Sequence, residues 1–143
     1  MKETTYSLEE TPPTAEEMLQ RWRQYTEKNL PYLVAKIEDK IVGYAYACPY
    51  RSRSAYRFTV EESVYVAPTY HGRGIGRQLL YTLIATCKAQ GYQQMIAVIA
   101  GNDNTASMHF HQKLGFKQVG ILEKVGFKFN RWIDTPLMQK ELQ

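Results

Sequence analysis

The chain is poor in cysteine and has no long apolar segment. Its 143 residues include two cysteines, Cys48 and Cys87, which lie on different expected elements without the spacing of metal ligands. Two reduced core thiols are therefore expected rather than a disulfide or a metal site. No apolar run approaches the ~18 residues of a membrane span, and Met1–Thr5 lacks the apolar stretch of a signal peptide. These absences predict a single cytoplasmic domain, residues 1–143, with no metal and no membrane partner.

The positive charge of the chain is modest and is not concentrated in one segment. Eighteen Lys and Arg against fourteen Asp and Glu give a net charge of +4. The basic residues are spread from Lys2 to Lys140, which is typical of a solvated surface and does not favour nucleic-acid binding. Part of the excess lies at five arginines near the expected anion sites: Arg51, Arg53, Arg57, Arg73 and Arg77.

The hydrophobic periodicity predicts helices packed on a mixed sheet. Thr14 and Glu17 have the spacing of a capping box, which starts a helix expected to run to about residue 29. Helical spacing places three of its side chains in the core: Met18, Trp22 and Tyr25. The pattern further predicts strands at 32–37, 41–47, 56–66, 94–100, 116–122 and from 133, and helices at 77–90 and 105–114. This order indicates an α/β (α+β) fold, with a loop at 123–132 that either covers a site or packs on the sheet edge.

A glycine-rich turn joins an expected strand to an expected helix. It reads His71-Gly72-Arg73-Gly74-Ile75-Gly76. Such a turn points backbone N–H groups outward at the positive end of the helix dipole, where a pyrophosphate is stabilised. Arg77 and Gln78 follow, so the Lys-Ser/Thr ending of a P-loop is missing, and the glycine spacing differs from the dinucleotide fingerprint. A plain strand-to-helix connection is the alternative at this point.

Two adjacent carboxylates lie on the strand before this turn. Alternation along the strand places Glu62 on one face with Val60 and Val64, and Glu61 on the other face with Ser63. Glu61 is the candidate general base, and an exposed strand carboxylate is the alternative. Glu62 is expected to have little effect on activity and to serve as an internal control.

Three blocks of sequence resemble a known family. Val66-Ala67-Pro68 followed by His71-x-x-Gly74-x-Gly76 is similar to the acyl-CoA-binding signature of the GCN5-related N-acetyltransferases, whose first position is usually Gln or Arg rather than His. Together with the blocks 50–66 and 104–116, and a weaker block at 124–134, the chain resembles the phosphinothricin and methionine sulfone acetyltransferase branch. The resemblance implies a mixed, mainly antiparallel sheet flanked by helices. It also implies an N-terminally shortened version, because relatives carry a further strand and helix before the segment where this chain begins.

The resemblance implies acetyl-CoA as co-substrate and assigns its binding residues. The pyrophosphate is expected on the backbone of the glycine-rich turn, the thioester oxygen at the end of the preceding strand, and the pantetheine arm at the start of the 105–114 helix. The cofactor-binding residues are then Val64, Tyr65, Val66, His71, Gly72, Arg73, Gly74, Ile75, Gly76, Arg77, Asn104 and Ser107.

The resemblance also implies the reaction and the acceptor. Glu61 would take a proton from an α-ammonium group, and His111 would donate one to the departing thiolate. Arg51 and Arg53, with Tyr56 and Glu61, would bind a small amino acid of the methionine sulfone, methionine sulfoximine or phosphinothricin type, because a guanidinium suits a carboxylate. A homodimer is expected, as in the relatives.

Two other function classes stay open from the sequence. The first is a truncated, catalytically impaired acyl-CoA-binding or interaction protein, which would bind acetyl-CoA without transferring the acetyl group. The second is a basic nucleic-acid-binding domain, which would show salt-sensitive binding to DNA or RNA.

Overall fold

The computed structural model describes residues 14–143, which form helices and one sheet. The helices are α1 (Ala15–Glu27), α2 (Ile75–Ala89) and α3 (Thr105–Lys113), with short 3-10 turns η1 (Ser54–Tyr56) and η2 (Pro68–Tyr70). The strands are β1 (Tyr32–Ile37), β2 (Lys40–Pro49), β3 (Thr59–Val66), β4 (Gln94–Val98), β5 (Lys117–Lys128) and β6 (Arg131–Glu141). None of the helices within this part of the chain has the length and apolar character needed to span a membrane.

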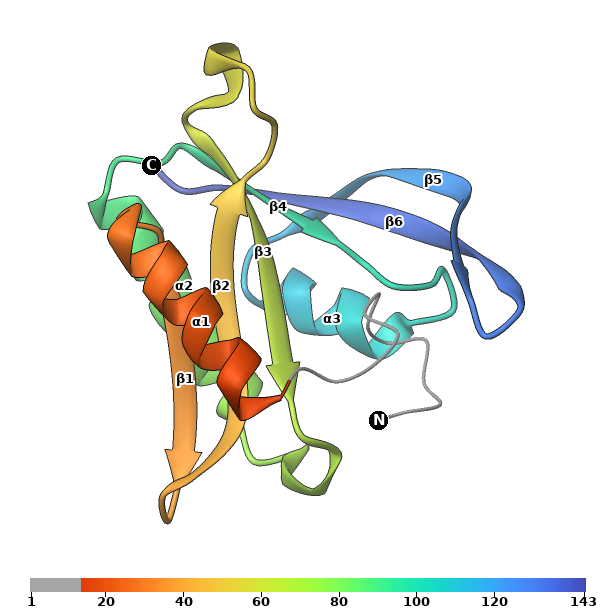
Figure 1. The fold of residues 1–143 in the computed structure, drawn as a ribbon. Coiled ribbons are helices and arrows are strands. Elements are labelled where there is room, and N and C mark those ends of the chain that lie inside the picture. Colours follow the sequence, from red (N-terminus) through yellow and green to blue (C-terminus); the bar gives the residue numbers. More distant parts are fainter. Residues whose placement is uncertain (1–13) are drawn as a thin grey trace.

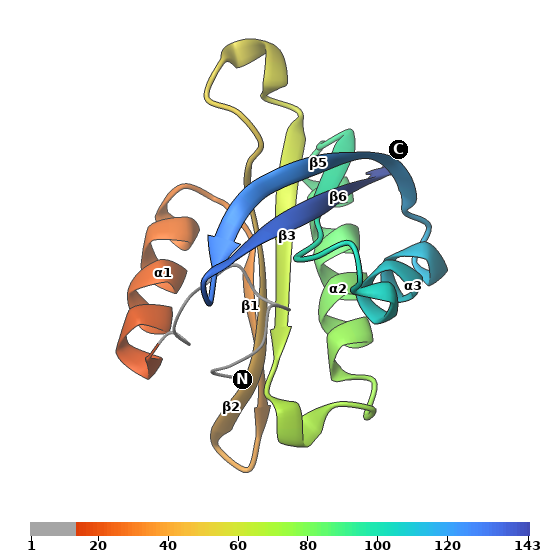
Figure 2. The same cartoon turned by 90° about the vertical axis from the view of Figure 1, so that its right-hand side faces the viewer.

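The six strands form one sheet in the order β1-β2-β3-β4-β6-β5. β3 and β4 pair in parallel, and the other neighbouring strands pair antiparallel. α1 lies on one face of the sheet, whereas α2 and α3 lie on the other (Figures 1 and 2). The predicted fold class, a mixed and mainly antiparallel sheet flanked by helices, is confirmed.

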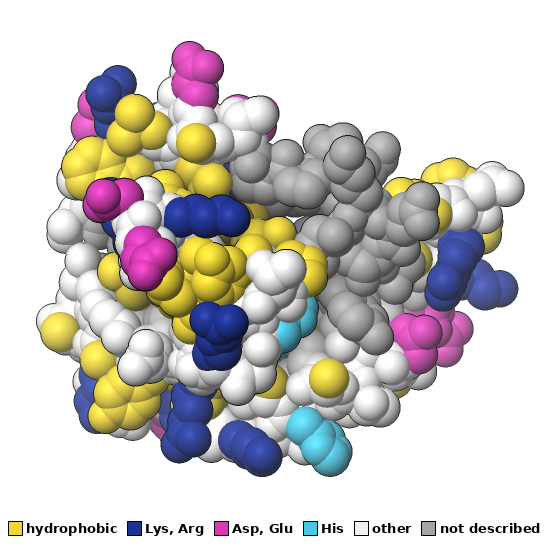
Figure 3. Space-filling model, turned by 90° about the horizontal axis from the view of Figure 1, so that it is seen from below, with side chains coloured by type: hydrophobic (Ala, Val, Ile, Leu, Met, Phe, Trp, Pro, Cys, Tyr) yellow, Lys and Arg dark blue, Asp and Glu magenta, His cyan; other side chains and the backbone are white. Residues whose placement is uncertain are grey.

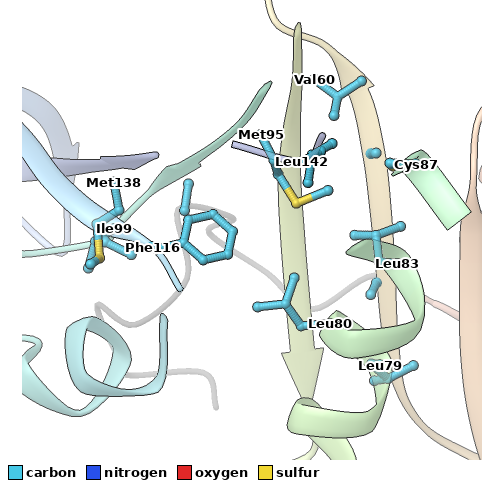
Figure 4. Close-up of a cluster of buried hydrophobic side chains, with 13 residues drawn as sticks. Val60, Leu79, Leu80, Leu83, Cys87, Met95, Ile99, Phe116, Met138 and Leu142 are labelled. Atoms are coloured by element: carbon cyan, nitrogen blue, oxygen red, sulfur yellow. The ribbon is translucent and has the colours of Figure 1, made fainter. Parts of the chain in front are cut away.

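The main core lies between α2 and the sheet. Leu80, Leu83 and Cys87 are fully buried on one stripe of α2, as the helical spacing predicts. They pack with Val60 of β3 and Met95 of β4 (Figure 4). The same cluster continues past β4 to three further side chains, which follow β4, follow α3 and lie in β6: Ile99, Phe116 and Met138.

The pairing of β3 with β4 ends before β3 itself ends. The parallel ladder joins Thr59–Glu62 to Gln94–Ala97, whereas β3 stays paired with β2 as far as Val66. The last four residues of β3 therefore have a strand on one side only. This separation opens the sheet between β3 and β4, directly before the glycine-rich turn.

Two sequence-based expectations about elements are wrong. The segment 123–132 is not a covering loop, because β5 runs to Lys128 and β6 begins at Arg131, with irregular register between Leu122 and Gly126. The strand expected from residue 56 begins at Thr59, since Ser54–Tyr56 forms a 3-10 turn. A bulge and a tight hairpin interrupt the apolar alternation of β5 and β6, which is why the sequence pattern resembled a loop.

The expected core positions of α1 are also only partly realised. The capping box is present, since Thr14 Oγ1 accepts a hydrogen bond from Glu17 N at 3.1 Å. No residue of α1 is buried, and the Trp22 side chain is 44% exposed. Tyr25 does contact the sheet, with its ring edge-on to Tyr32 and Tyr46. The amphipathic spacing therefore predicts which face of α1 contacts the sheet, but it overestimates how far the side chains on that face are buried.

Candidate functional site

The glycine-rich turn has the backbone geometry of an anion cradle. Gly72 and Gly74 adopt φ of +80° and +78°, and Gly74 is the N-cap of α2 without a side-chain cap. A Cβ on either glycine would meet nothing within 4 Å, so the backbone is open to an approaching ligand. The first N–H groups of α2, from Ile75 onward, therefore lack an internal acceptor and favour an anion.

Side chains around the turn fix its shape and make it positive. His71 Nε2 donates to the backbone oxygen of Val66 at 2.8 Å, which folds the turn back on the end of β3. Arg73 lies over the ring of Tyr70, and Arg77 occupies the first turn of α2, which contains no acidic residue. Lys and Arg side chains are visible on this end of the molecule in Figure 3.

The end of β3 offers backbone donors to the gap beside β4. Tyr50 N donates to Thr59 O and Ala67 N donates to Val42 O, one bond just beyond each end of the β2–β3 ladder and in the same register. Because ladder bonds recur at every second residue, Tyr65 also points its N–H at β2. Val64 and Val66 point the other way, past the end of the β3–β4 pairing. The family resemblance implies that Val64, Tyr65 and Val66 bind the thioester oxygen. The N–H of Tyr65 is directed at β2, so of these three only Val64 and Val66 have backbone N–H groups directed at the gap.

Asn104 and Ser107 form the start of α3. Asn104 is buried at the N-cap, and its Oδ1 accepts a hydrogen bond from Ser107 N at 3.2 Å. Both residues expected on the pantetheine side therefore belong to the N-terminal cap of α3. Ser107 lies four residues before His111. Their position is fixed by the placement of α3.

His111 is buried and paired with Glu62, which the sequence did not predict. His111 Nε2 lies 3.1 Å from Glu62 Oε1, and the two side chains are 7% and 4% exposed. His111 Nδ1 donates to the backbone oxygen of Ser107 at 2.8 Å. Burial alone would lower the pKa of His111, but the hydrogen bond and charge of Glu62 together with the Ser107 carbonyl raise it above its ordinary value.

Glu62 is therefore a buried and paired carboxylate, and the expectation that it has little effect on activity stays a prediction. It does lie on the face opposite Glu61, as predicted, but that face is the core side of the sheet. A signal for this was present: Glu62 is a carboxylate on a strand face otherwise made of valines, and a buried carboxylate needs a partner. The identity of the partner, 49 residues along the chain, could not be inferred locally.

Glu61 lies on the α1 face and is half-buried. Its register partner in β2 is Cys48. Burial raises the pKa of the Glu61 carboxyl, the nearby Arg51 guanidinium opposes this, and the charge of Glu62 adds to the rise. A carboxyl with a raised pKa in a partly enclosed position has the properties of a general base.

Three of the four expected substrate-binding residues lie on the loop between β2 and β3, and the fourth, Glu61, lies on β3. This loop projects from the sheet in Figure 1, and Arg51, Arg53 and Tyr56 are all exposed on it. Arg51 lies over the ring of Tyr50, and Tyr56 contacts the same ring edge-on. The charge of Arg51 lowers the pKa of the Glu61 carboxyl, so these two side chains interact. Arg53 is the N-cap residue of η1.

A cluster of tyrosines shares the sheet face of Glu61. Tyr32, Tyr44 and Tyr46 stack on β1 and β2, Tyr65 of β3 stacks on Tyr44, and Tyr25 of α1 closes over Tyr32 and Tyr46. The alternation of Tyr44 and Tyr46 in the sequence was the signal for this cluster. Among residues 14–143, no group of His, Cys, Asp or Glu is placed to hold a metal ion.

Comparison with known proteins identifies the family. Residues 2–116 match the Acetyltransferase (GNAT) family. The chain is 54% identical over 138 residues to a phosphinothricin N-acetyltransferase of Alcaligenes faecalis, covering 96% of this chain and 70% of that protein. It is 41% identical over 112 residues to an L-methionine sulfoximine/L-methionine sulfone acetyltransferase of Salmonella typhimurium, covering 78% of this chain and 65% of that protein.

A solved structure agrees with the sequence relatives. A phosphinothricin acetyltransferase from Sinorhizobium meliloti, crystallised with AcCoA, superposes with a TM-score of 0.88 at 45% identity, covering 98% of this chain and 76% of that one. The chain therefore belongs to the GNAT family of acetyltransferases. The family and enzyme class predicted from the sequence are confirmed.

The electrostatic relation between Arg51 and Glu61 can be measured. Arg51→Ala removes the cation that opposes the effect of burial, so the pKa of the Glu61 carboxyl should rise further above its ordinary value. The measurement is an NMR titration of ¹³C-labelled glutamate side chains, with the Glu61 signal assigned from Glu61→Gln. The control is Arg57→Ala on the same loop, because Arg57 donates to Ser54 O and lies over Phe58. A Glu61 titration unchanged by Arg51→Ala would contradict the proposed charge interaction.

Proposed function

We propose that this protein is an acetyl-CoA-dependent N-acetyltransferase that acts on the α-amino group of a small amino acid or analogue. The relatives named above support acceptors of the phosphinothricin, methionine sulfoximine or methionine sulfone type. One observation carries the proposal: a half-buried Glu61 with a raised pKa stands beside the opening between β3 and β4, and the anion cradle follows at the end of β3. The proposed base and the proposed cofactor cleft would thus lie along one strand.

The cofactor half of the site would be built from backbone. The pyrophosphate of acetyl-CoA would bind the N–H groups of the turn from Gly72 to Arg77, which the positive φ of its glycines leaves open. The acetyl oxygen would accept hydrogen bonds from the N–H groups of Val64 and Val66, where negative charge develops during transfer. Asn104 and Ser107 at the start of α3 would border the pantetheine arm.

The acceptor half would lie on the α1 face. Arg51 and Arg53 would bind the substrate carboxylate, with Tyr56 beside them. Glu61 would accept a proton from the substrate ammonium, so that the neutral amine can attack the acetyl carbon. The C–N bond then forms, the C–S bond breaks, and the thiolate of CoA leaves and takes up a proton.

The family resemblance makes His111 the expected donor of that last proton. Both ring nitrogens of His111 are already hydrogen-bonded inside the protein, to Ser107 O and to Glu62. Donation to a thiolate would require one of these bonds to break. Proton donation by His111 therefore stays a prediction from the family resemblance, and Glu61 is the catalytic residue of this proposal.

The central test is Glu61→Gln. Removal of the base should lower kcat by about 100- to 1,000-fold while acetyl-CoA still binds, a loss of the size found for general-base catalysis. The measurement is thiol release from acetyl-CoA with a panel of amino-acid acceptors. The control is Glu141→Gln, an exposed carboxylate on another strand of the same sheet. Binding of acetyl-CoA without thiol release for any acceptor would instead support the catalytically impaired acyl-CoA-binding protein.

The cradle can be tested with two glycines that have the same backbone conformation. Gly74→Ala and Gly91→Ala each force a side chain into positive φ, with φ of +78° and +92° and open space around the Cβ. Each should destabilise the fold by about 1–2 kcal/mol. Only Gly74→Ala should also weaken acetyl-CoA binding, by about tenfold, because Gly91 follows the other end of α2. Calorimetric titration measures this, and equal affinities in the two variants would contradict the cradle.

We also propose that the protein is a homodimer through the β5–β6 hairpin. β5 is an edge strand, and the hairpin exposes large apolar side chains: Ile121, Val125, Phe127, Phe129 and Trp132. An exposed apolar patch of this kind is typical of an interface. Sedimentation velocity should give twice the mass of one chain, and the double substitution of Phe127 and Trp132 by Ser should reduce it to one. A monomeric parent, or an unchanged dimer in the double variant, would contradict this interface; Tyr81→Ser on α2 is the control.

A further inference from the structure

The buried pair of Glu62 and His111 joins two elements that border the opening in the sheet. Glu62 is the last residue of β3 that pairs with β4, opposite Ala97. His111 comes from α3, on the same side of the sheet as α2 (Figure 2). Their hydrogen bond of 3.1 Å therefore connects β3 to α3 at the point where β3 and β4 separate.

His111 is fixed within α3 by its ring and by its backbone. Its ring lies edge-on between Phe110 and Phe116, with centroid distances of 5.3 and 5.1 Å. Its backbone oxygen accepts from both Leu114 N and Phe116 N, where the helix ends. The His111 ring cannot turn without disturbing these contacts, so a change at the ring should shift the whole short helix.

α3 in turn touches the anion cradle. A Cβ on Gly76 would lie 3.6 Å from Phe110 Cζ and 3.4 Å from Val66 Cγ2, so Phe110 packs directly against the first turn of α2. Asn104, at the other end of α3, borders the pantetheine side in the proposed function. The placement of α3 therefore sets the distance between the two walls that would hold acetyl-CoA.

We propose that Glu62 is a positioning residue for acetyl-CoA binding, acting through His111 on the placement of α3. This inference rests on the proposed function. It assigns the pair a role that needs the hydrogen bond and not the charge of the carboxylate. In the parent protein Nδ1–H donates to Ser107 O and Nε2–H donates to the Glu62 carboxylate. A glutamine amide at position 62 can keep a hydrogen bond with either form of the ring, because its oxygen can accept from Nε2–H and its NH₂ group can donate to an unprotonated Nε2. Glu62→Gln should therefore preserve the contact, whereas Glu62→Ala should leave a buried ring nitrogen unpaired.

The test compares these two variants of the full chain. Glu62→Ala should weaken acetyl-CoA binding by about tenfold in calorimetric titration and raise the KM for acetyl-CoA similarly. The KM for the amino-acid acceptor should stay within about twofold, because Glu61 lies on the opposite face of the sheet from Glu62 and the loop of Arg51 projects from the end of β2 and β3. Glu62→Gln should restore the affinity for acetyl-CoA. The matched control for lost stability is Ile133→Ala, which removes a buried side chain of β6.

Several outcomes would overturn the inference. Unchanged acetyl-CoA affinity in Glu62→Ala, or equal weakening in Ile133→Ala, would show that the pair does not position the cofactor side. Failure of Glu62→Gln to restore affinity, or a large loss of kcat in that variant, would show that the carboxylate itself is needed. A parent protein that does not bind acetyl-CoA would overturn the proposed function, and this inference with it. Binding by the parent with no transfer would overturn the transferase proposal while the affinity comparison still decides the role of Glu62.

Discussion

The separation of β3 from β4 after Glu62 is the constraint on which the rest of the candidate site depends. A strand inside a sheet normally satisfies its backbone groups on both sides, and leaving them unpaired in a partly buried place is unfavourable. β3 continues for four residues beyond its last pair with β4 while still bound to β2. The N–H groups of Val64 and Val66 are thereby offered to a ligand. The glycine-rich turn follows directly, so backbone donors from the end of the strand and from the start of α2 lie at the same end of the sheet.

Two adjacent carboxylates acquire different properties from this one strand. Alternation turns Glu61 toward the α1 face and Glu62 toward the core, where His111 is its partner. Burial is partial for Glu61, with Arg51 opposing the rise of its pKa, and nearly complete for Glu62. A partly enclosed carboxyl can exchange a proton with a substrate, whereas a fully buried one that is hydrogen-bonded to a histidine serves better to hold structure. Environment, rather than residue type, separates the properties of the two side chains and the roles proposed for them.

Local features of the site could be predicted from the sequence, and long-range pairs could not. The cradle follows from glycines at positions that require positive φ, and the two faces of β3 follow from the period of a strand. The Glu62–His111 contact joins residues 49 positions apart, so spacing could show only that Glu62 needed a partner. The β5–β6 hairpin was hidden because an irregular register breaks the apolar alternation. The shallow burial of α1 depends on how much of it the sheet covers, which amphipathic spacing does not report.

The tyrosine cluster gives the α1 face a physical role beyond packing. Stacked rings from β1, β2 and β3 and the edge-on ring of Tyr25 cover part of the sheet face on which Glu61 also lies. Burial is the largest cause of the raised pKa of the Glu61 carboxyl, so the surroundings that bury this side chain also raise its affinity for a proton. A carboxylate whose proton affinity is raised can accept a proton from an ammonium group more readily than one in water. In the proposed mechanism the aromatic face and Glu61 would act together, because low polarity near the carboxylate favours proton transfer from the ammonium group and so the neutral amine needed for attack.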